Sequence, residues 1–358
     1  MGQKYDERRS AFRVKSTIIS HDIIYRSGTY MEDMDATKRV INKLKAGASY
    51  FACGGYLSSL DKLHRTEIYN TLGFERLERK NRDIMRLYEE CDCNWPQTFY
   101  MVLLRTMGGI DNKETFTELA RRVPYAAILR EKMAPQNIEA MLIGATGLLE
   151  LYQHDEYILN LKRNFEYLSA KYSIEAMEAS EWKLTHIYPN NHPILRLSQI
   201  TTFLVHTNNV MDRILECRTG DDVQRLFGVE TLPYWLTHYT PAAVTRSVSK
   251  RIGRTKSDLL AINLIAQMQF AYGSYITSES LRERALSLLE NISAEKNSII
   301  AQWNSFGPLA RSAFDSQALL QLSFEYCKHH RCEECVVGRR ILRQATKATQ
   351  TEKISHLI

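Results

Sequence analysis

The sequence has no apolar run that approaches the roughly 20 residues needed for a membrane-spanning helix. Residues 1–15 are polar and charged and contain no apolar signal-peptide core. We therefore expect a cytoplasmic protein without a membrane segment. The seven cysteines are odd in number and unevenly spaced, which argues against a disulfide framework. In a reducing compartment, clustered thiols favour metal or redox use instead.

The common catalytic signatures are also missing. The chain has no Gly-rich phosphate loop, no His-Glu-x-x-His and no Gly-x-Ser-x-Gly motif. No Ser–His–Asp or Cys–His set is evident, so no catalytic residue is predicted, and the sequence leaves open whether the chain is an enzyme. An enzyme would have to assemble its site from distant residues such as Asp315, Arg196 and His192.

The residues that are present have ordinary globular composition. The chain has 358 residues, 44% hydrophobic and 25% charged, which is enough for a large core and one or two domains. Apolar residues recur at helical spacing from about residue 35 onward, and strands do not alternate with helices. We predict a mainly all-α fold, a multi-helix bundle or irregular helical array with a short, strand-like N-terminal arm.

The expected organisation is an arm or remnant over residues 1–34, a helical domain over 35–345 and a flexible tail over 346–358. A subdivision of the helical domain is expected near 175–195, where prolines and paired asparagines predict a loop. Within the helical domain, Asn94 and Pro96 predict a helix start. Gly144 and Gly147 form a strip of small residues that lets another helix approach closely, and residues 259–272 read as a central buried helix.

The strongest chemical signal lies in residues 327–335, here called the thiol tail, where three thiols fall within nine residues: Cys327-Lys-His-His-Arg-Cys332-Glu-Glu-Cys335. Zinc and iron–sulfur sites both use such short cysteine spacings, so we predict a metal site with Cys327, Cys332 and Cys335 as ligands. A fourth ligand is missing locally. Cys217 is the predicted one, and the alternatives are His329, His330, Cys91, Cys93 or solvent.

The formal net charge of +6 permits contact with nucleic acid or acidic partners without requiring it. Basic residues gather in two places, one around residues 246–256 and one around the thiols. The alternative is that both groups are solvated helix faces. The predicted nucleic-acid-binding residues are Arg251, Arg254, Lys328, Arg331, Arg339 and Arg340.

Several segments carry a family resemblance. They include Phe74-Glu-Arg-Leu-Glu-Arg-Lys, Trp95-Pro-Gln-Thr-Phe-Tyr and Pro189-Asn-Asn-His-Pro-Ile-Leu-Arg-Leu, together with residues 138–149, 270–273, 297–300, 315–322 and the thiol tail. In order and spacing the chain resembles, from roughly residue 50 to 345, a bacterial family known as domain of unknown function 2851. Members usually carry an additional strand-rich N-terminal region, so the resemblance implies that most of it is lacking here. The family supplies no reaction to carry over.

Two functional interpretations follow. The first is a helical module that carries zinc or an iron–sulfur cluster and binds nucleic acid, because the thiols are surrounded by cations. The second is a protein-interaction scaffold without metal or catalysis, because amphipathic helices are abundant and no catalytic set is present. Neither interpretation fixes the oligomeric state.

Overall fold

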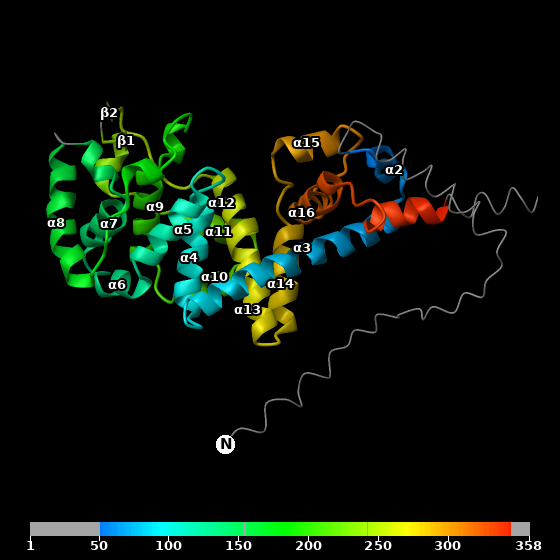
Figure 1. Cartoon of the computed structure of the whole chain (residues 1–358), viewed down its shortest axis with the longest axis horizontal. Coiled ribbons are helices and arrows are strands. Elements are labelled where there is room, and N and C mark those ends of the chain that lie inside the picture. The colour runs from blue at the N-terminus through cyan, green and yellow to red at the C-terminus, as the bar shows by residue number, and fades with distance from the viewer. Residues whose placement is uncertain (1–50, 153–154, 242, 345–358) are drawn as a thin grey trace, which may run out of the picture.

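A computed structural model describes residues 51–152, 155–241 and 243–344 of the chain. These residues are mostly helical, which confirms the predicted all-α class (Figure 1). The sheet found among them is one small antiparallel pair, β1 (His238–Thr240) with β2 (Ala243–Val244). The predicted arm at 1–34 and tail at 346–358 lie outside the described residues. In the part that the structure describes, no helix is long and apolar enough to cross a membrane.

The first half of the chain contains α2 (Gly54–Ser59), α3 (Lys62–Glu90), α4 (Trp95–Met107), α5 (Lys113–Arg122), α6 (Tyr125–Arg130), α7 (Pro135–Gly144), η1 (Leu148–Leu151), α8 (Glu156–Tyr172) and η2 (Ala179–Glu181). The second half contains η3 (Pro189–Asn191), α9 (Pro193–His206), α10 (Val210–Glu216), α11 (Gly220–Phe227), η4 (Pro233–Leu236), α12 (Arg254–Leu260), η5 (Ala261–Ile265), α13 (Ala266–Tyr275), α14 (Glu279–Glu290), α15 (Ser298–Asn304), α16 (Ala313–Gln321), η6 (Leu322–Tyr326) and η7 (Cys327–His329).

Helix α3 organises the molecule because it belongs to two hydrophobic cores. Its N-terminus is capped by Asp61, whose carboxylate accepts a 2.9 Å hydrogen bond from the amide of His64. The first half of the helix buries Ile68 and Leu72 in a smaller core, and the second half buries Ile84 and other apolar residues in a larger one. Figure 1 shows α3 running from the smaller lobe, which contains the smaller core, into the larger lobe, which contains the larger core.

The larger core is formed by α4 to α14. At its centre α12, the π-turn η5 and α13 follow one another as a nearly continuous buried element, which confirms the predicted central helix. The predicted small-residue strip is also confirmed. Helices α7 and α8 pack together, and a side chain at Gly144 would overlap the ring of Phe165. Gly147 has a φ of +71° and lies against the carbonyl of Met177, so a larger residue there would be strained.

The smaller core joins the start of the described chain to its end. Phe51 packs edge-on against Trp303 of α15, with ring centroids 4.8 Å apart. Leu57 of α2 and Leu319 of α16 are fully buried in the same core, and α16 packs along α3. The chain regions that meet here are separated by most of the sequence, so the fold itself brings them together.

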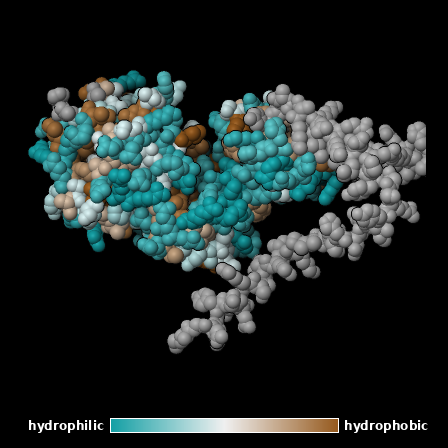
Figure 2. Space-filling model, viewed as in Figure 1, coloured by the Kyte–Doolittle hydropathy of each residue, from teal (hydrophilic) through white to brown (hydrophobic). Residues whose placement is uncertain are grey.

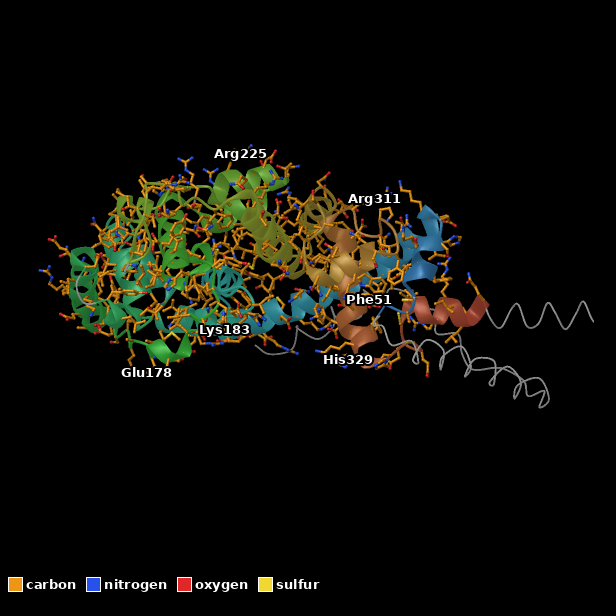
Figure 3. All side chains as sticks on the ribbon, turned by 90° about the horizontal axis from the view of Figure 1, so that it is seen from above. Phe51, Glu178, Lys183, Arg225, Arg311 and His329 are labelled. Atoms are coloured by element: carbon orange, nitrogen blue, oxygen red, sulfur yellow. The ribbon has the colours of Figure 1, made fainter. Side chains whose placement is uncertain are left out.

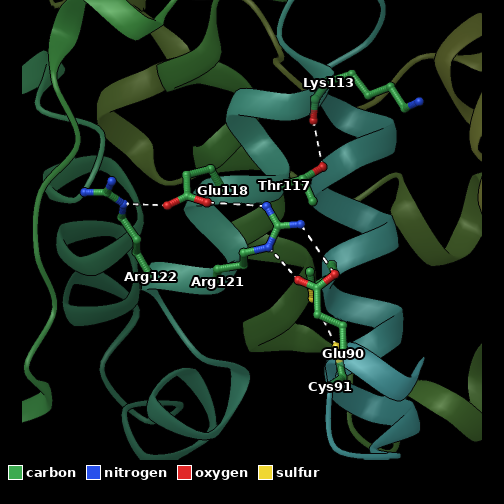
Figure 4. Close-up of polar contacts among 8 residues, drawn as sticks. Glu90, Cys91, Lys113, Thr117, Glu118, Arg121 and Arg122 are labelled. Carbon is green, nitrogen blue, oxygen red and sulfur yellow. Dashed lines mark hydrogen bonds and ion pairs between the residues drawn. The ribbon is translucent and has the colours of Figure 1, made fainter. Parts of the chain in front are cut away.

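Polar contacts fix the far end of α3 against α5. Arg121 donates from Nε to Glu90 at 2.5 Å and from a terminal nitrogen to Glu118 at 3.3 Å, while Arg122 donates to Glu118 at 2.9 Å (Figure 4). These groups are largely exposed, so each pair stabilises the fold by less than about 1 kcal/mol. Their position shows that Cys91, at the C-terminus of α3, lies in the larger lobe.

The region expected to divide the helical domain, residues 175–195, is largely exposed but packs against the larger core at a few positions. Met177 and Trp182 are both buried there, and the indole of Trp182 donates a 2.9 Å hydrogen bond to the carbonyl of Thr146. The two cores meet along α3 between Leu72 and Leu77.

Candidate functional site

Four thiols line one small cavity in the smaller lobe. Three are the tail cysteines Cys327, Cys332 and Cys335, and the fourth is Cys53, at the beginning of the described chain. The cavity has a volume of about 40 Å³. The thiols of Cys53 and Cys327 are in hydrogen-bond contact. The remaining lining residues are Ala52, Leu322, Tyr326, His330, Gly338 and Ile341.

Local backbone geometry explains how the tail thiols converge. The π-turn η6 leads directly into η7, and the chain then reverses at His330, which has a φ of +51°. After this reversal the amide of Arg331 donates to the carbonyl of Tyr326 at 3.0 Å, and the amide of Cys335 donates to that of Arg331 at 3.2 Å. Gly338 is required because a Cβ there would overlap the carbonyl of Cys332.

Burial and hydrogen bonding favour the neutral form of two of these thiols, Cys53 and Cys335. The hydrogen bond from Cys327 and burial together hold the pKa of Cys53 well above its usual value. Burial raises the pKa of Cys335 to about 11, although the amides of Gly338 and Val337 at the start of helix 336–344 oppose this rise. These two amides are the groups that would stabilise a thiolate on Cys335.

Cys217, the predicted fourth ligand, does not line this cavity, and the fourth thiol there belongs to Cys53. Cys217 lies in the larger core, where its thiol contacts the carbonyl of Arg213 at 3.4 Å. It lines a different pocket, which also contains Arg225. Figure 3 shows Phe51 and His329 near one another, whereas Arg225 lies in the other lobe. No local sequence signal points to Cys53, because only the fold joins it to the three tail cysteines.

The other predicted donors are divided between the two lobes. Cys91 is buried in the larger core, where its sulfur lies 3.0 Å from that of Met101, and Cys93 follows it in an exposed turn. His330 lines the thiol cavity, but His329 does not. Across residues 51–152, 155–241 and 243–344, no group of three or more His, Cys, Asp or Glu side chains has metal-site geometry. The four thiols therefore share a cavity without a closed ligand set.

The predicted nucleic-acid-binding residues fall on two separate surfaces. Arg254 begins α12 and Arg251 precedes it, whereas the other four lie on the segment that carries Cys327, Cys332 and Cys335 or directly after it. Carboxylates pair with four of the six: Arg251 with Glu230, Arg254 with Asp221 and Asp258, Arg331 with Glu334, and Arg340 with Glu67. Among the described residues, no carboxylate pairs with Lys328 or Arg339.

The three residues considered for an assembled catalytic site do not meet. Asp315 is in the smaller lobe, where it completes a capping box with Ser312 at the start of α16. Arg196 and His192 are buried in the larger lobe, and Arg196 donates to Gln199 at 2.8 Å.

One comparison with known proteins gives the family of the chain. The model of a family described as "protein of unknown function (DUF2851)" matches residues 30–298, which is well over half of the sequence. The chain belongs to this family. No curated protein and no solved structure matches it. The DUF2851 match begins earlier than the resemblance expected from the sequence, and it ends before the tail.

The limits of the DUF2851 match divide the thiol cavity. Cys53 lies inside the matched residues, whereas Cys327, Cys332 and Cys335 lie beyond them. All of the larger core except Ala313 and Phe314 lies inside them. The family assignment therefore supports the helical scaffold and does not bear on the three tail thiols.

Proposed function

We propose that this DUF2851 chain is a metal-bearing module in which Cys53, Cys327, Cys332 and Cys335 hold one zinc ion or iron–sulfur cluster, and that the basic surface around it binds nucleic acid. The observation that carries the proposal is the presence of four thiols from opposite ends of the described chain on one cavity. Four cysteines are a complete ligand set for either centre.

The size of the cavity favours a single zinc ion over a cluster. A volume of about 40 Å³ suits one ion with four thiolates, whereas a cluster requires the walls to move apart. Binding requires the thiols to rotate inward and to lose their protons, so we expect metal affinity to rise with pH. The ion would link residue 53 to the tail and thereby stabilise the smaller core.

Elemental analysis of the anaerobically purified full chain, with an absorption spectrum, tests the metal centre. We expect one zinc ion per chain and no visible colour; stoichiometric iron with visible absorption would identify the cluster instead. Cys53→Ser and Cys335→Ser should reduce the metal content sharply. Cys217→Ser is the matched control, because it alters a buried thiol in the other lobe. Stoichiometric absence of both metals, or equal metal loss in all three variants, would disprove the centre.

The nucleic-acid half of the proposal depends on the cations beside the thiol cavity. Lys328 and Arg339 have no described carboxylate partner, so their charges are available to phosphate. Each phosphate contact releases counterions, which makes binding fall steeply with salt. We expect the double variant Lys328→Ala, Arg339→Ala to weaken DNA or RNA binding and to flatten its salt dependence.

Fluorescence anisotropy with single-stranded and duplex oligonucleotides over a salt series measures this effect. The control is Arg251→Ala with Arg254→Ala, because these residues lie on the other lobe and pair with carboxylates. The proposed surface is excluded if neither oligonucleotide binds, or if the control pair weakens binding as much as the pair beside the thiols.

A further inference from the structure

A second, larger cavity lies between the two lobes, where the surface in Figure 2 is hollowed above α3. Its volume is about 470 Å³, within the range that small-molecule sites occupy. The walls come from the middle of α3, the end of α4, the start of α5, the α12–α13 element and the segment before α15. All of these residues lie within the DUF2851 match.

Cations outnumber acids in this cleft. The acidic lining residues are Asp83 and Glu295, and the basic ones are Lys80, Arg105, Lys113, Lys256 and Lys296. Five positive side chains therefore stand against two negative ones in the lining, although Glu114, just outside it, pairs with Arg105 and with Lys113 at 3.6 Å each. Because the cations come from separate helices and loops, this excess is a property of the folded cleft and is not visible in any one segment.

Two of the lysines are partly buried without a counter-ion. In the described residues no carboxylate forms an ion pair with Lys80 or Lys256. The ammonium of Lys256 donates to the carbonyls of Thr106 at 3.2 Å and Met107 at 3.5 Å, at the C-terminal end of α4. Burial, together with neighbouring arginines, lowers the pKa of Lys80 to about 8 and that of Lys256 to about 7. An anion in the cleft would relieve this uncompensated charge.

Asp83 and Glu295 act on Lys80 through space, but neither forms an ion pair with Lys80 or with Lys256. Glu295 accepts hydrogen bonds from Gln317 and from Asn297, and burial raises the pKa of its carboxyl group. The side-chain amide of Gln317 lies between Arg76 and Glu295. Its oxygen accepts a hydrogen bond from the buried guanidinium of Arg76, and its nitrogen donates one to Glu295. Asp83 reaches Arg86, 4.0 Å away and largely exposed.

The remaining walls define the chemistry of the ligand. None of the lining residues is aromatic, so the cleft offers no surface on which a nucleobase would stack. It offers charged donors from lysine and Arg105, whose buried Nε has no hydrogen-bond partner in the described structure, and amides from Asn263 and Gln267. This set suits a compact anion with several oxygens.

We propose that the cleft between the lobes binds a small ligand that carries two or more phosphoryl groups, held by Lys80, Arg105 and Lys256. The ligand is recognised through its phosphates, and the remainder of its structure lies toward the open side of the cleft. The proposal does not depend on the thiol cavity, which lies in the smaller lobe and shares no residue with this cleft.

Calorimetric titration of the full chain with inorganic pyrophosphate, at constant ionic strength, tests this site. We expect saturable binding that Lys80→Gln and Lys256→Gln each weaken by about tenfold or more, the usual effect of losing a charged hydrogen bond. Lys162→Gln is the control. Lys162 lies on α8, pairs with Glu150 of η1 and does not line the cleft. A parallel titration with ATP separates a bare polyphosphate ligand from a nucleotide, since tighter ATP binding identifies added contacts beyond the phosphates.

The same variants show whether a loss of binding reflects the site or the fold. Removing a partly buried, unpaired charge should leave the melting temperature unchanged or raise it, and Cys53→Ser should leave pyrophosphate binding intact. The proposal is overturned if neither pyrophosphate nor ATP binds saturably, or if Lys162→Gln weakens binding as much as the two cleft variants.

Discussion

Single buried polar residues hold parts of the larger core together, and Glu139 is the clearest case. Its side chain is fully buried, accepts a 2.7 Å hydrogen bond from the indole of Trp235 and also accepts from the hydroxyl of Tyr157. It therefore joins α7 to α8 and to η4. Burial raises the pKa of this carboxyl group, although the two donors oppose the rise.

Replacing Glu139 by Ala should lower the free energy of unfolding by about 3–5 kcal/mol, because it opens a cavity and leaves two buried donors without an acceptor. Urea denaturation at neutral pH measures the change. Glu139→Gln keeps an acceptor oxygen for Trp235 and should cost less. Equal stability of the two variants would show that the hydrogen bonds contribute nothing measurable.

The buried imidazole of His192 makes the fold sensitive to acid. It is 9% exposed, its Nδ1 has no hydrogen-bond partner in the described structure, and burial lowers its pKa from 6.5 to about 4. A depressed pKa means that the folded state resists protonation, so the stabilisation is present above pH 6.5 and is lost as the pH falls toward 4. The difference, 6.5 − 4 or about 2.5 pH units, corresponds to roughly 3 kcal/mol.

His192→Gln should remove this part of the pH dependence. Chemical denaturation of both proteins between pH 7 and pH 4 is the measurement, and the two stability curves should converge as the pH falls. Parallel curves over the whole range would mean that another group carries the acid sensitivity.

At the scale of elements, the contact between α3 and α16 depends on a residue without a side chain. A Cβ at Gly73 would overlap the ring of Phe314, and both residues are buried. Gly73→Ala gains up to about 1 kcal/mol of helix propensity, but forcing the ring aside costs about 1–3 kcal/mol, so a net loss of stability is expected. Gly55→Ala in α2 has open space around the added methyl and should be neutral or stabilising. Thermal unfolding of the two variants compares them directly; stabilisation by both would contradict the close contact.

Local signals in the sequence predicted the elements better than their meeting points. Asn94 caps α4 as predicted, accepting a 3.1 Å hydrogen bond from Gln97, and Pro96 occupies the first turn. Such signals act within a few residues of one another. The π-turn η6 has no comparable signal, yet it sets the direction in which Cys327 points. Cys53 is missed for the related reason that its place beside Cys327 results from long-range packing.

The same distinction applies to the cations. Lys250 and Lys256 belong to one basic group in the sequence, but their environments in the fold differ completely. Lys250 is 3% exposed, donates to the carbonyl of Val248 at 3.1 Å and lies over the ring of Tyr239, whereas Lys256 faces the cleft. Lys80 and Lys296 line this cleft although they are far apart in the sequence, so counting charges along the chain does not predict the positive charge of the cleft.

At the scale of the whole molecule, two cores share one helix. The smaller core contains Trp303 of α15, whose indole donates to Ser323 at 2.8 Å, and the larger one contains α4 to α14. Since residues of α3 belong to both cores, we expect unfolding of one core to destabilise the other through this helix. The helix has no proline or other interruption between Lys62 and Glu90, as such a role requires.

Interrupting α3 near the junction of the cores should uncouple them. Glu78 is exposed, so Glu78→Pro removes no core contact, but it breaks the helix at a cost of about 3 kcal/mol. We expect amides of α15 and α16 to exchange with solvent deuterium at lower urea than amides of α7 and α9, with the two groups closer together in the natural sequence. Glu78→Ala controls for the loss of the carboxylate and should preserve the natural pattern. If both groups of amides open together in the proline variant, the cores are coupled through contacts such as α14 with α16 rather than through α3.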